Sequence, residues 1–259
     1  MNLNNKTKAL VVLSGGQDST TCLYIAKQEF DEVYAVSFDY GQKHKIELES
    51  ARKIAEMAGV AHEIIDVRHV LESMSPLTTS AAILEKYDNA TQMDEVIGNR
   101  VELTFVPMRN MLFLTIAANH AVALGCSHIY TGICQQDNAN YPDCTENFRQ
   151  LMEDTINISL GRNPFNPAEK LTIAAPLMYL SKAESVHLAH SMPLCWEALA
   201  YSHTSYDGVY PPTGKNHANV LRADGFEKAG LPDPLVLRAY TEGLMPLPET
   251  ANYKDIHNA

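Results

Sequence analysis

The sequence is poor in basic charge, and its cysteines show no paired spacing. The 20 Lys and Arg residues are outnumbered by 31 Asp and Glu residues, which gives a net charge of −11 at pH 7. Because binding to nucleic-acid phosphates needs clustered Lys and Arg, this balance argues against direct nucleic-acid binding, although a local basic pocket can still hold an anionic substrate. The five cysteines are odd in number and contain no C-x-x-C pair, which favours free thiols over a disulfide framework.

The sequence also lacks any apolar run that approaches the length of a membrane span. Residues 1–8 are polar and contain no apolar signal region, so we expect a cytoplasmic protein that does not associate with membranes. What is present is a normal apolar content of 46% over 259 residues, which suits one large domain or one domain with an appendage.

A short glycine motif joins the first expected strand, residues 9–13, to a helical pattern at residues 20–29. The motif reads Ser14-Gly15-Gly16-Gln17-Asp18-Ser19. Glycines let backbone N–H groups face inward, and a helix N-terminus adds partial positive charge, so the motif predicts an anion site. No Lys follows the glycines, which excludes the Walker loop of kinases and GTPases. Backbone donors and a bound cation can still hold a pyrophosphate there; the alternative is an ordinary strand-to-helix turn.

Short apolar runs alternate with helical patterns along the first 190 residues. Further strands are expected near residues 33–38, 62–67 and 127–132, and residues 173–177 form a further short apolar segment. Further helices are expected near residues 45–58, 111–124, 145–160 and 181–190. This alternation predicts an α/β fold with right-handed crossovers and a mostly parallel sheet that carries helices on both faces. Ligands of such sheets bind at the carboxyl ends of the strands, where the glycine motif and residues 39–42 lie.

Three segments have weaker patterns. Residues 75–102 are expected to form a long loop, either mobile over the site or a passive insertion. Residues 135–144 are dense in polar side chains, although Asp143 alone is explained by the N-cap of the following helix. The stretch from residue 192 onwards is rich in Pro, Tyr and Gly, and we expect irregular structure with one helix near residues 222–230. The chain is therefore divided into residues 1–190, an α/β domain that holds the predicted anion site, and residues 191–259, a C-terminal region with a tail.

Six motifs in register carry a resemblance to a known family. They are the glycine motif, Phe38-Asp39-Tyr40-Gly41-Gln42-Lys43-His44, Phe105-Val106-Pro107-Met108-Arg109-Asn110, Thr131-Gly132-Ile133-Cys134 with Asp137, Tyr141-Pro142-Asp143-Cys144, and Pro176-Leu177 with Ser181-Lys182-Ala183-Glu184. Together they resemble QueC, the 7-cyano-7-deazaguanine synthases among the PP-loop ATP pyrophosphatases, from about residue 8 to about residue 233. The resemblance implies a Rossmann-like fold of the adenine nucleotide α-hydrolase type.

The resemblance also implies a reaction. ATP activates the carboxylate of 7-carboxy-7-deazaguanine as an acyl adenylate, ammonia captures the adenylate as an amide, and a second activation dehydrates the amide to the nitrile used for queuosine. A carboxylate is a poor electrophile, and adenylation gives it a good leaving group. The protein then has to position the reactants and stabilise charge at the α-phosphate.

The resemblance assigns roles to particular residues. The expected ATP-binding residues are Ser14, Gly15, Gly16, Gln17, Asp18, Ser19, Phe38 and Gly132, with Mg²⁺ near Asp18. Expected catalytic residues are Asp18, Arg109 and Lys182; the alternatives are a surface ion pair for Arg109 and helix solvation for Lys182. Expected substrate-binding residues are Gln42, His44, Arg109, Asp137, Tyr141 and Asp143, of which His44 is equally well explained as a structural residue.

The chain departs from the family at a zinc site. The family's four cysteine positions fall here on Ser205, Thr213, Asn216 and Asn219. None of these is a zinc ligand, so we expect no zinc and a region around residues 201–219 that folds without metal. A rebuilt site of Cys195, His203 and His217 is an alternative that lacks the usual tight ligand spacing.

Two enzyme functions and one binding function compete. The first is the nitrile synthase with ammonia as nucleophile. The second is a QueC-like amide ligase that attaches the deazaguanine to a protein amine, as in antiphage defence, which the altered zinc region favours. The third is a non-catalytic nucleotide-binding module, against which the retained Asp18, Arg109, Asp143 and Lys182 argue. The resemblance further implies a homodimer.

Overall fold

A computed structural model describes residues 7–42, 45–71, 75, 77–78, 85–135, 141–163, 166, 169–204, 208–212 and 215–257. The predictions for His44, Asp137, Ser205 and Thr213 lie outside these residues.

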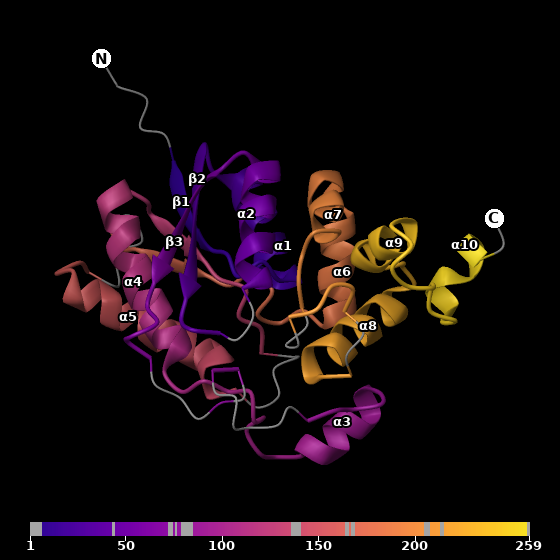
Figure 1. The fold of residues 1–259 in the computed structure, drawn as a ribbon. Coiled ribbons are helices and arrows are strands. Elements are labelled where there is room, and N and C mark those ends of the chain that lie inside the picture. The colour runs from indigo at the N-terminus through magenta and orange to yellow at the C-terminus, as the bar shows by residue number, and fades with distance from the viewer. Residues whose placement is uncertain are drawn as a thin grey trace.

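Five parallel strands form one sheet in the order β3-β2-β1-β4-β5 (Figure 1). The strands are β1 (Lys8–Val12), β2 (Glu32–Asp39), β3 (Ala61–Asp66), β4 (His128–Tyr130) and β5 (Thr172–Ala174). The central position of β1 explains its continuous apolar sequence, because a parallel strand covered by helices is buried on both faces. Ala9, Leu10 and Val11 are all fully buried. The predicted parallel sheet is confirmed.

Helices cover both faces of this sheet, as predicted. On one face lie α1 (Gln17–Glu29), α2 (Ile46–Ala58), α6 (Lys182–His190) and α7 (Pro193–Leu199), whose apolar residues form one buried cluster with Ala9 and Val11. On the other face lie α4 (Arg109–Leu124) and α5 (Glu146–Ser159), which share a second cluster with Leu10 (Figure 1). The alternation of β1 side chains between the clusters follows from the period of a strand.

The predicted start of α6 is confirmed by a capping box. The Ser181 side chain accepts a hydrogen bond from the Glu184 backbone N–H, and the Glu184 carboxylate accepts from the Ser181 backbone N–H. These two bonds satisfy N–H groups that the first helical turn leaves without partners. They fix where α6 begins, and Lys182 is its first residue.

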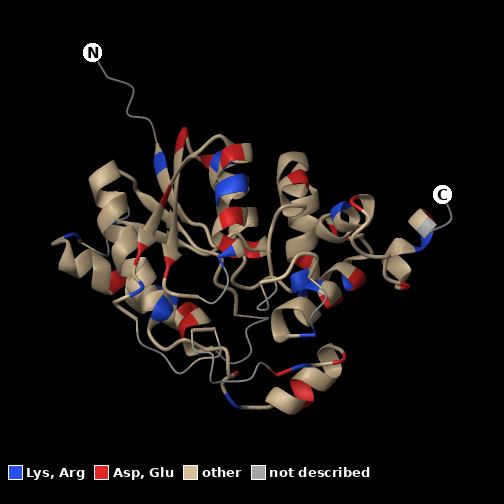
Figure 2. Ribbon diagram, in the orientation of Figure 1, with Lys and Arg blue, Asp and Glu red and all other residues tan. Residues whose placement is uncertain are grey.

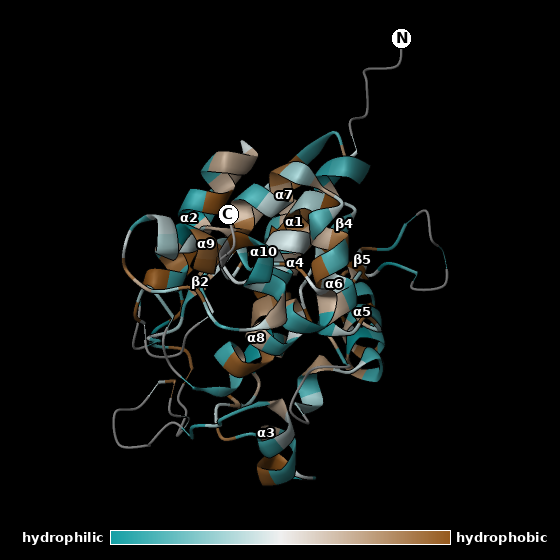
Figure 3. Ribbon diagram, turned by 90° about the vertical axis from the view of Figure 1, so that its right-hand side faces the viewer, coloured by the Kyte–Doolittle hydropathy of each residue, from teal (hydrophilic) through white to brown (hydrophobic). Residues whose placement is uncertain are grey.

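The loop expected at residues 75–102 is wrong in part, because it contains the helix α3 (Ala90–Ile97). Asn89 caps this helix by accepting from the Gln92 backbone N–H at 2.9 Å. Its apolar residues Met93 and Ile97 pack against α8 (His217–Ala229) rather than against the sheet. In the side view α3 lies apart from the main body beside α8 (Figure 3).

The C-terminal region is more helical than the single helix expected near residues 222–230. It contains α7, α8, α9 (Pro234–Thr241) and the short α10 (Lys254–His257). Cys195, Leu199 and Phe226 belong to the same buried cluster as β1 and α1. The helices α7 and α8 therefore pack directly on the α/β layers, and the division at residue 190 stays a prediction.

The remaining global expectations concern cysteines, membranes and charge. All five cysteines are free, as predicted, and all five are buried. Within the described ranges, no helix is long and apolar enough to cross a membrane. Basic and acidic residues are interspersed over many elements of the ribbon (Figure 2).

Candidate active site

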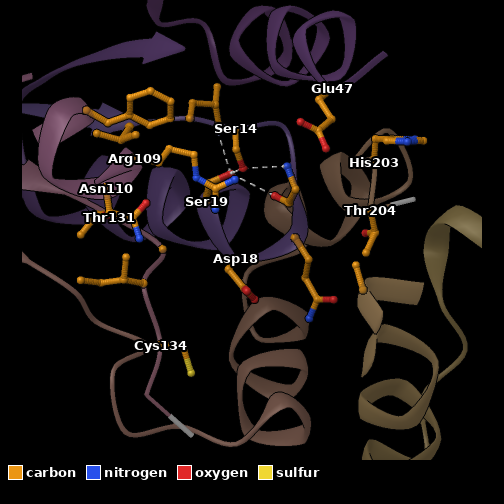
Figure 4. A pocket seen from close by; sticks show the side chains of 18 of the residues that line it. Ser14, Asp18, Ser19, Glu47, Arg109, Asn110, Thr131, Cys134, His203 and Thr204 are labelled. Atoms are coloured by element: carbon orange, nitrogen blue, oxygen red, sulfur yellow. Dashed lines mark hydrogen bonds between the residues drawn. The ribbon is translucent and has the colours of Figure 1, made fainter. Parts of the chain in front are cut away.

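A cleft of about 320 Å³ opens beyond the carboxyl ends of β1, β2 and β4 (Figure 4). Here the sheet order reverses between β1 and β4, which is where open parallel sheets bind ligands. Most of the residues that the sequence assigned to a site line this cleft: Ser14, Gly16, Gln17, Asp18, Ser19, Phe38, Gln42, Arg109, Gly132, Tyr141 and Lys182.

The glycine motif forms the floor of the cleft and opens α1. Ser14 is linked to Ser19, since its backbone N–H donates to the Ser19 Oγ at 3.1 Å and the two hydroxyl oxygens lie 3.0 Å apart. Gly16 is the N-cap of α1, so no side chain caps the first turn from that position. The first N–H groups of the helix and its dipole are therefore available to an anion.

Gly15 shapes the motif without lining the cleft. Its φ of +84° is in the left-handed region, and a Cβ there would lie 2.3 Å from the Glu47 carbonyl oxygen. Only glycine fits this close approach to α2.

Gly132 has a comparable role on the other side of the motif. A Cβ at this position would lie 2.9 Å from the Ser19 backbone nitrogen and 3.1 Å from the Asp18 carbonyl carbon. The missing side chain lets the segment after β4 approach the start of α1. Gly132 therefore helps to hold the anion-binding backbone in place.

Asp18 and Lys182 form an ion pair inside the cleft. The Lys182 Nζ lies 2.9 Å and 3.1 Å from the two carboxylate oxygens of Asp18. Asp18 stands in the first turn of α1 and Lys182 at the first position of α6, so two helix N-termini meet here. A carboxylate oxygen beside a phosphate-binding loop is a suitable Mg²⁺ ligand, and the ammonium can reach phosphate oxygens.

The position of Lys182 depends on a glycine that the sequence analysis did not single out. A Cβ at Gly225 of α8 would lie 2.2 Å from Lys182 Cγ. The stem of Lys182 therefore passes over Gly225 on its way to Asp18. A glycine inside a helical pattern was the available signal, because such a glycine often marks a close packing contact.

Arg109 begins α4 and faces the cleft. Its guanidinium carbon lies 5.7 Å from the centre of the Tyr40 ring, and its Nη1 donates to the Tyr40 hydroxyl at 3.5 Å. The preceding Met108 has a φ of 64°, a conformation that is strained for a residue other than glycine. Both features orient Arg109 toward the centre of the site.

Aromatic rings form the wall next to the glycine motif. Phe38 at the end of β2 stacks on Phe113 of α4, with ring centres 4.2 Å apart and planes inclined by 12°. Both rings line the cleft, and a flat base can pack beside them. The sequence identified Phe38 but not Phe113, whose contribution depends on where α4 crosses the sheet.

Two of the predicted substrate-binding residues, Tyr141 and Gln42, line the cleft but make different contacts. Tyr141 lines the cleft and donates from its hydroxyl to the Glu102 carboxylate at 3.1 Å. Gln42 lines it as well, but its amide accepts from the Tyr40 N–H and donates to the Phe38 carbonyl, so it braces the loop after β2.

Asp143 lies behind the cleft wall in the short helix η1 (Pro142–Cys144). It accepts a hydrogen bond from the backbone N–H of Asn110, and Asn110 lines the cleft. Burial raises the pKa of Asp143, while Arg109 opposes the rise. Through these contacts Asp143 positions Asn110 and the start of α4.

Asn216 and Asn219 are the two described positions at which the QueC resemblance expects zinc cysteines, and both lie at the start of α8. Asn216 is its N-cap and accepts from the Asn219 backbone N–H at 3.1 Å. His203 and His217 line the cleft, whereas Cys195 lies in the core beside α1. Among the residues that the structure describes, no three His, Cys, Asp or Glu side chains are arranged to hold a metal.

A buried ion pair connects this region instead. The Arg222 guanidinium binds the Asp233 carboxylate at 2.6 and 2.8 Å and donates to the hydroxyls of Ser202 and Thr204, each at 2.8 Å. The adjacent His203 backbone N–H donates to the Gly15 carbonyl at 2.8 Å. Arg222 therefore holds the segment that contacts the glycine motif.

Comparisons with known proteins identify a family for this chain. The family described as queuosine biosynthesis protein QueC matches residues 8–230. A 7-cyano-7-deazaguanine synthase of Laribacter hongkongensis is 46% identical over 240 residues, which cover 91% of this chain and 97% of that protein. The synthase of Chromobacterium violaceum is 44% identical over 244 residues, or 93% of this chain and 98% of that one.

The fold and cleft thus define a nucleotide-binding α/β protein with a pyrophosphate loop. The chain belongs to the QueC family. Among solved structures, the ammonia-dependent NAD synthetase of Campylobacter jejuni aligns with 95% of this chain and 91% of its own at 14% identity and a TM-score of 0.42, which adds nothing to the assignment.

Proposed function

We propose that this protein converts 7-carboxy-7-deazaguanine to 7-cyano-7-deazaguanine with ATP and ammonia. The observation that carries the proposal is that residues of the QueC motifs line one cleft. The relatives that match this chain over nearly their whole length are 7-cyano-7-deazaguanine synthases. The altered zinc positions were the one feature that favoured the protein-conjugating ligase, and neither the cleft nor the relatives add support to it.

The residues of the cleft suit each part of adenylation. The N-terminus of α1 and the glycine motif take the pyrophosphate end of ATP, and adenine packs near Phe38. Arg109 and Lys182 supply positive charge for the α-phosphate as the substrate carboxylate attacks it. Asp18 would hold Mg²⁺, and the metal would neutralise phosphate charge. The deazaguanine then binds beside Tyr141 and beside the part of the cleft wall that Asp143 supports through Asn110.

The proposal includes the absence of zinc at the altered cysteine positions. Support comes from the Arg222–Asp233 ion pair and the Asn216 cap, which stabilise the region with protein groups alone. A cytoplasmic location, a homodimer and the lack of nucleic-acid or membrane partners are further parts of the proposal that rest on the sequence and the family.

A direct experiment incubates the protein with ATP, Mg²⁺, ammonium and 7-carboxy-7-deazaguanine and follows products by mass spectrometry. We expect the nitrile, AMP and pyrophosphate. Lys182→Met should lower pyrophosphate exchange by about 10²-fold or more, because it removes a positive charge at the phosphates. Lys228→Met, which alters an exposed pair on α8, is the matched control and should leave exchange intact. Amide or protein adduct without nitrile would contradict the proposal.

A further inference from the structure

The first turn of α2 carries a carboxylate that none of the proposed steps uses. Glu47 lines the cleft, and its side chain points from α2 toward the cavity (Figure 4). Within the described ranges, the carboxylate oxygens of Glu47 make no hydrogen bond or ion pair, although the Arg109 guanidinium acts on Glu47 through its charge. A negative group with nothing bound to it, on the wall of a phosphate-binding cleft, needs an explanation.

The surroundings of Glu47 disfavour its ionised form. Burial raises its pKa to about 7, and the Arg109 guanidinium of α4 opposes the rise. The Tyr40 hydroxyl, directly after β2, interacts electrostatically with Glu47. Burial raises the pKa of Tyr40 to about 12, Arg109 opposes this rise, and Glu47 adds to it. His203 lines the same cleft from the segment after α7. Glu47 therefore changes protonation state near neutral pH.

A carboxylate in this position repels phosphates and attracts cations. The proposed reaction has one cationic reactant besides the metal, because ammonia is mostly protonated at neutral pH. Ammonium has no lone pair, so it has to lose a proton before it can attack an acyl carbon. A base is most effective when its pKa lies near the working pH.

We propose that Glu47 binds the ammonium ion in the cleft and accepts its proton as the nitrogen attacks the acyl adenylate. This assignment rests on the proposed function and adds to it the site of the nitrogen donor. Glu47 is then a catalytic residue, distinct from Asp18, whose carboxylate already pairs with Lys182 and serves the phosphates.

The step balances in atoms and charge. One N–H bond of ammonium breaks, and its proton passes to the Glu47 carboxylate. The freed lone pair forms the C–N bond at the acyl carbon, the C–O bond to AMP breaks, and AMP leaves with that electron pair. The nitrogen loses a second proton to solvent as the amide forms, and Glu47 returns its own proton to solvent before the next turnover.

The test separates adenylation from capture of the adenylate by nitrogen. Pyrophosphate exchange with ATP and 7-carboxy-7-deazaguanine reports the first step, and amide plus nitrile formation at varied ammonium reports the second. Hydroxylamine is the diagnostic nucleophile, because it is largely unprotonated at neutral pH and needs no base to free its lone pair. The variants are Glu47→Gln and the control Glu49→Gln, which changes an exposed carboxylate in the same helical turn.

We expect Glu47→Gln to retain exchange and the hydroxamate rate while kcat/KM for ammonium falls by about 10²-fold or more. Glu49→Gln should match wild type throughout. Glu47→Asp keeps a proton acceptor, so it should recover part of the ammonium activity; the same comparison can be made with it if the glutamine variant does not fold.

Two results would overturn the assignment. A loss of exchange in Glu47→Gln would place the residue at the ATP or metal step. Equal losses with ammonium and hydroxylamine would mean that Glu47 only shapes the cleft. If the wild-type protein shows no pyrophosphate exchange with 7-carboxy-7-deazaguanine, the proposed function itself fails. That result differs from the two above, because both of them concern only the Glu47→Gln variant.

Discussion

Gly225 shows how one residue on α8 controls a charged side chain on α6. We expect Gly225→Ala to lower pyrophosphate exchange and to destabilise the fold by about 1–3 kcal/mol, because the new methyl group would overlap the Lys182 stem. An unobstructed Gly→Ala change inside a helix has the opposite sign and stabilises by roughly 0.5–1 kcal/mol.

The measurements are urea unfolding and exchange, with Ala223→Ser as an exposed neighbouring control on the same helix. A Gly225→Ala protein that is more stable and fully active would show that the Lys182 stem does not depend on this gap.

Glu47 should also leave a signature in stability. Its pKa is about 7 in the folded protein against 4.5 for an unperturbed carboxyl. The folded state therefore binds more protons than the unfolded state between these values, and the free energy of unfolding falls as pH rises through the window. Glu47→Gln lacks this titration, so we expect it to gain stability relative to wild type from pH 4.5 to pH 7. Urea unfolding below, within and above the window checks this; a constant difference would contradict it.

The sequence identified site residues that lie in local motifs and missed those that depend on long-range contacts. Asp18 and Lys182 were identifiable because each opens a helix within a recognisable motif, and the structure pairs them. Phe113 and Gly225 become informative only once α4 and α8 have been placed against β2 and α6. Glu47 carried no signal of its own, because a glutamate in the first turn of a helix is usually explained by the helix dipole.

At the scale of elements, burial against the sheet decides which helices were predictable. The expected helices at residues 45–58 and 145–160 differ by no more than a residue at each end from α2 and α5, whose apolar faces pack on the strands. The helix α3 was missed because it is short and buries its apolar residues against α8. Each of α7 and α9 begins with a proline, and a sequence rich in Pro favours irregular structure when the helix starts are unknown.

The contact between α8 and α9 gives a prediction of its own. Asp233→Asn should destabilise the protein by about 3–5 kcal/mol, because it leaves the buried guanidinium of Arg222 without its charge partner. The change isolates the charge, since asparagine can still cap α9 as Asp233 does.

The matched control is Asp224→Asn, which removes one partner of Lys228 from a partly exposed pair and should change stability by less than about 1 kcal/mol. Urea unfolding compares the two variants. Equal small effects would show that Arg222 and Asp233 do not hold the C-terminal helices together.

At the scale of the whole molecule, packed helices form the C-terminal region in which the QueC resemblance places a zinc site. We expect elemental analysis to find no stoichiometric zinc and a chelator to leave the melting temperature and exchange activity unchanged. The reason is that Asn216 and the Arg222–Asp233 pair already satisfy the groups around α8. Near-stoichiometric zinc, or a fall in melting temperature with chelator, would contradict this.

The central claim is that this cleft joins a deazaguanine carboxylate to AMP. The most direct measurement uses 7-carboxy-7-deazaguanine with ¹⁸O in the carboxylate and follows the label by mass spectrometry during turnover with ATP. We predict ¹⁸O in the phosphate of AMP and none in pyrophosphate, with the transfer abolished in Asp18→Ala. Label in inorganic phosphate with ADP as product, or unlabelled AMP, would contradict the account.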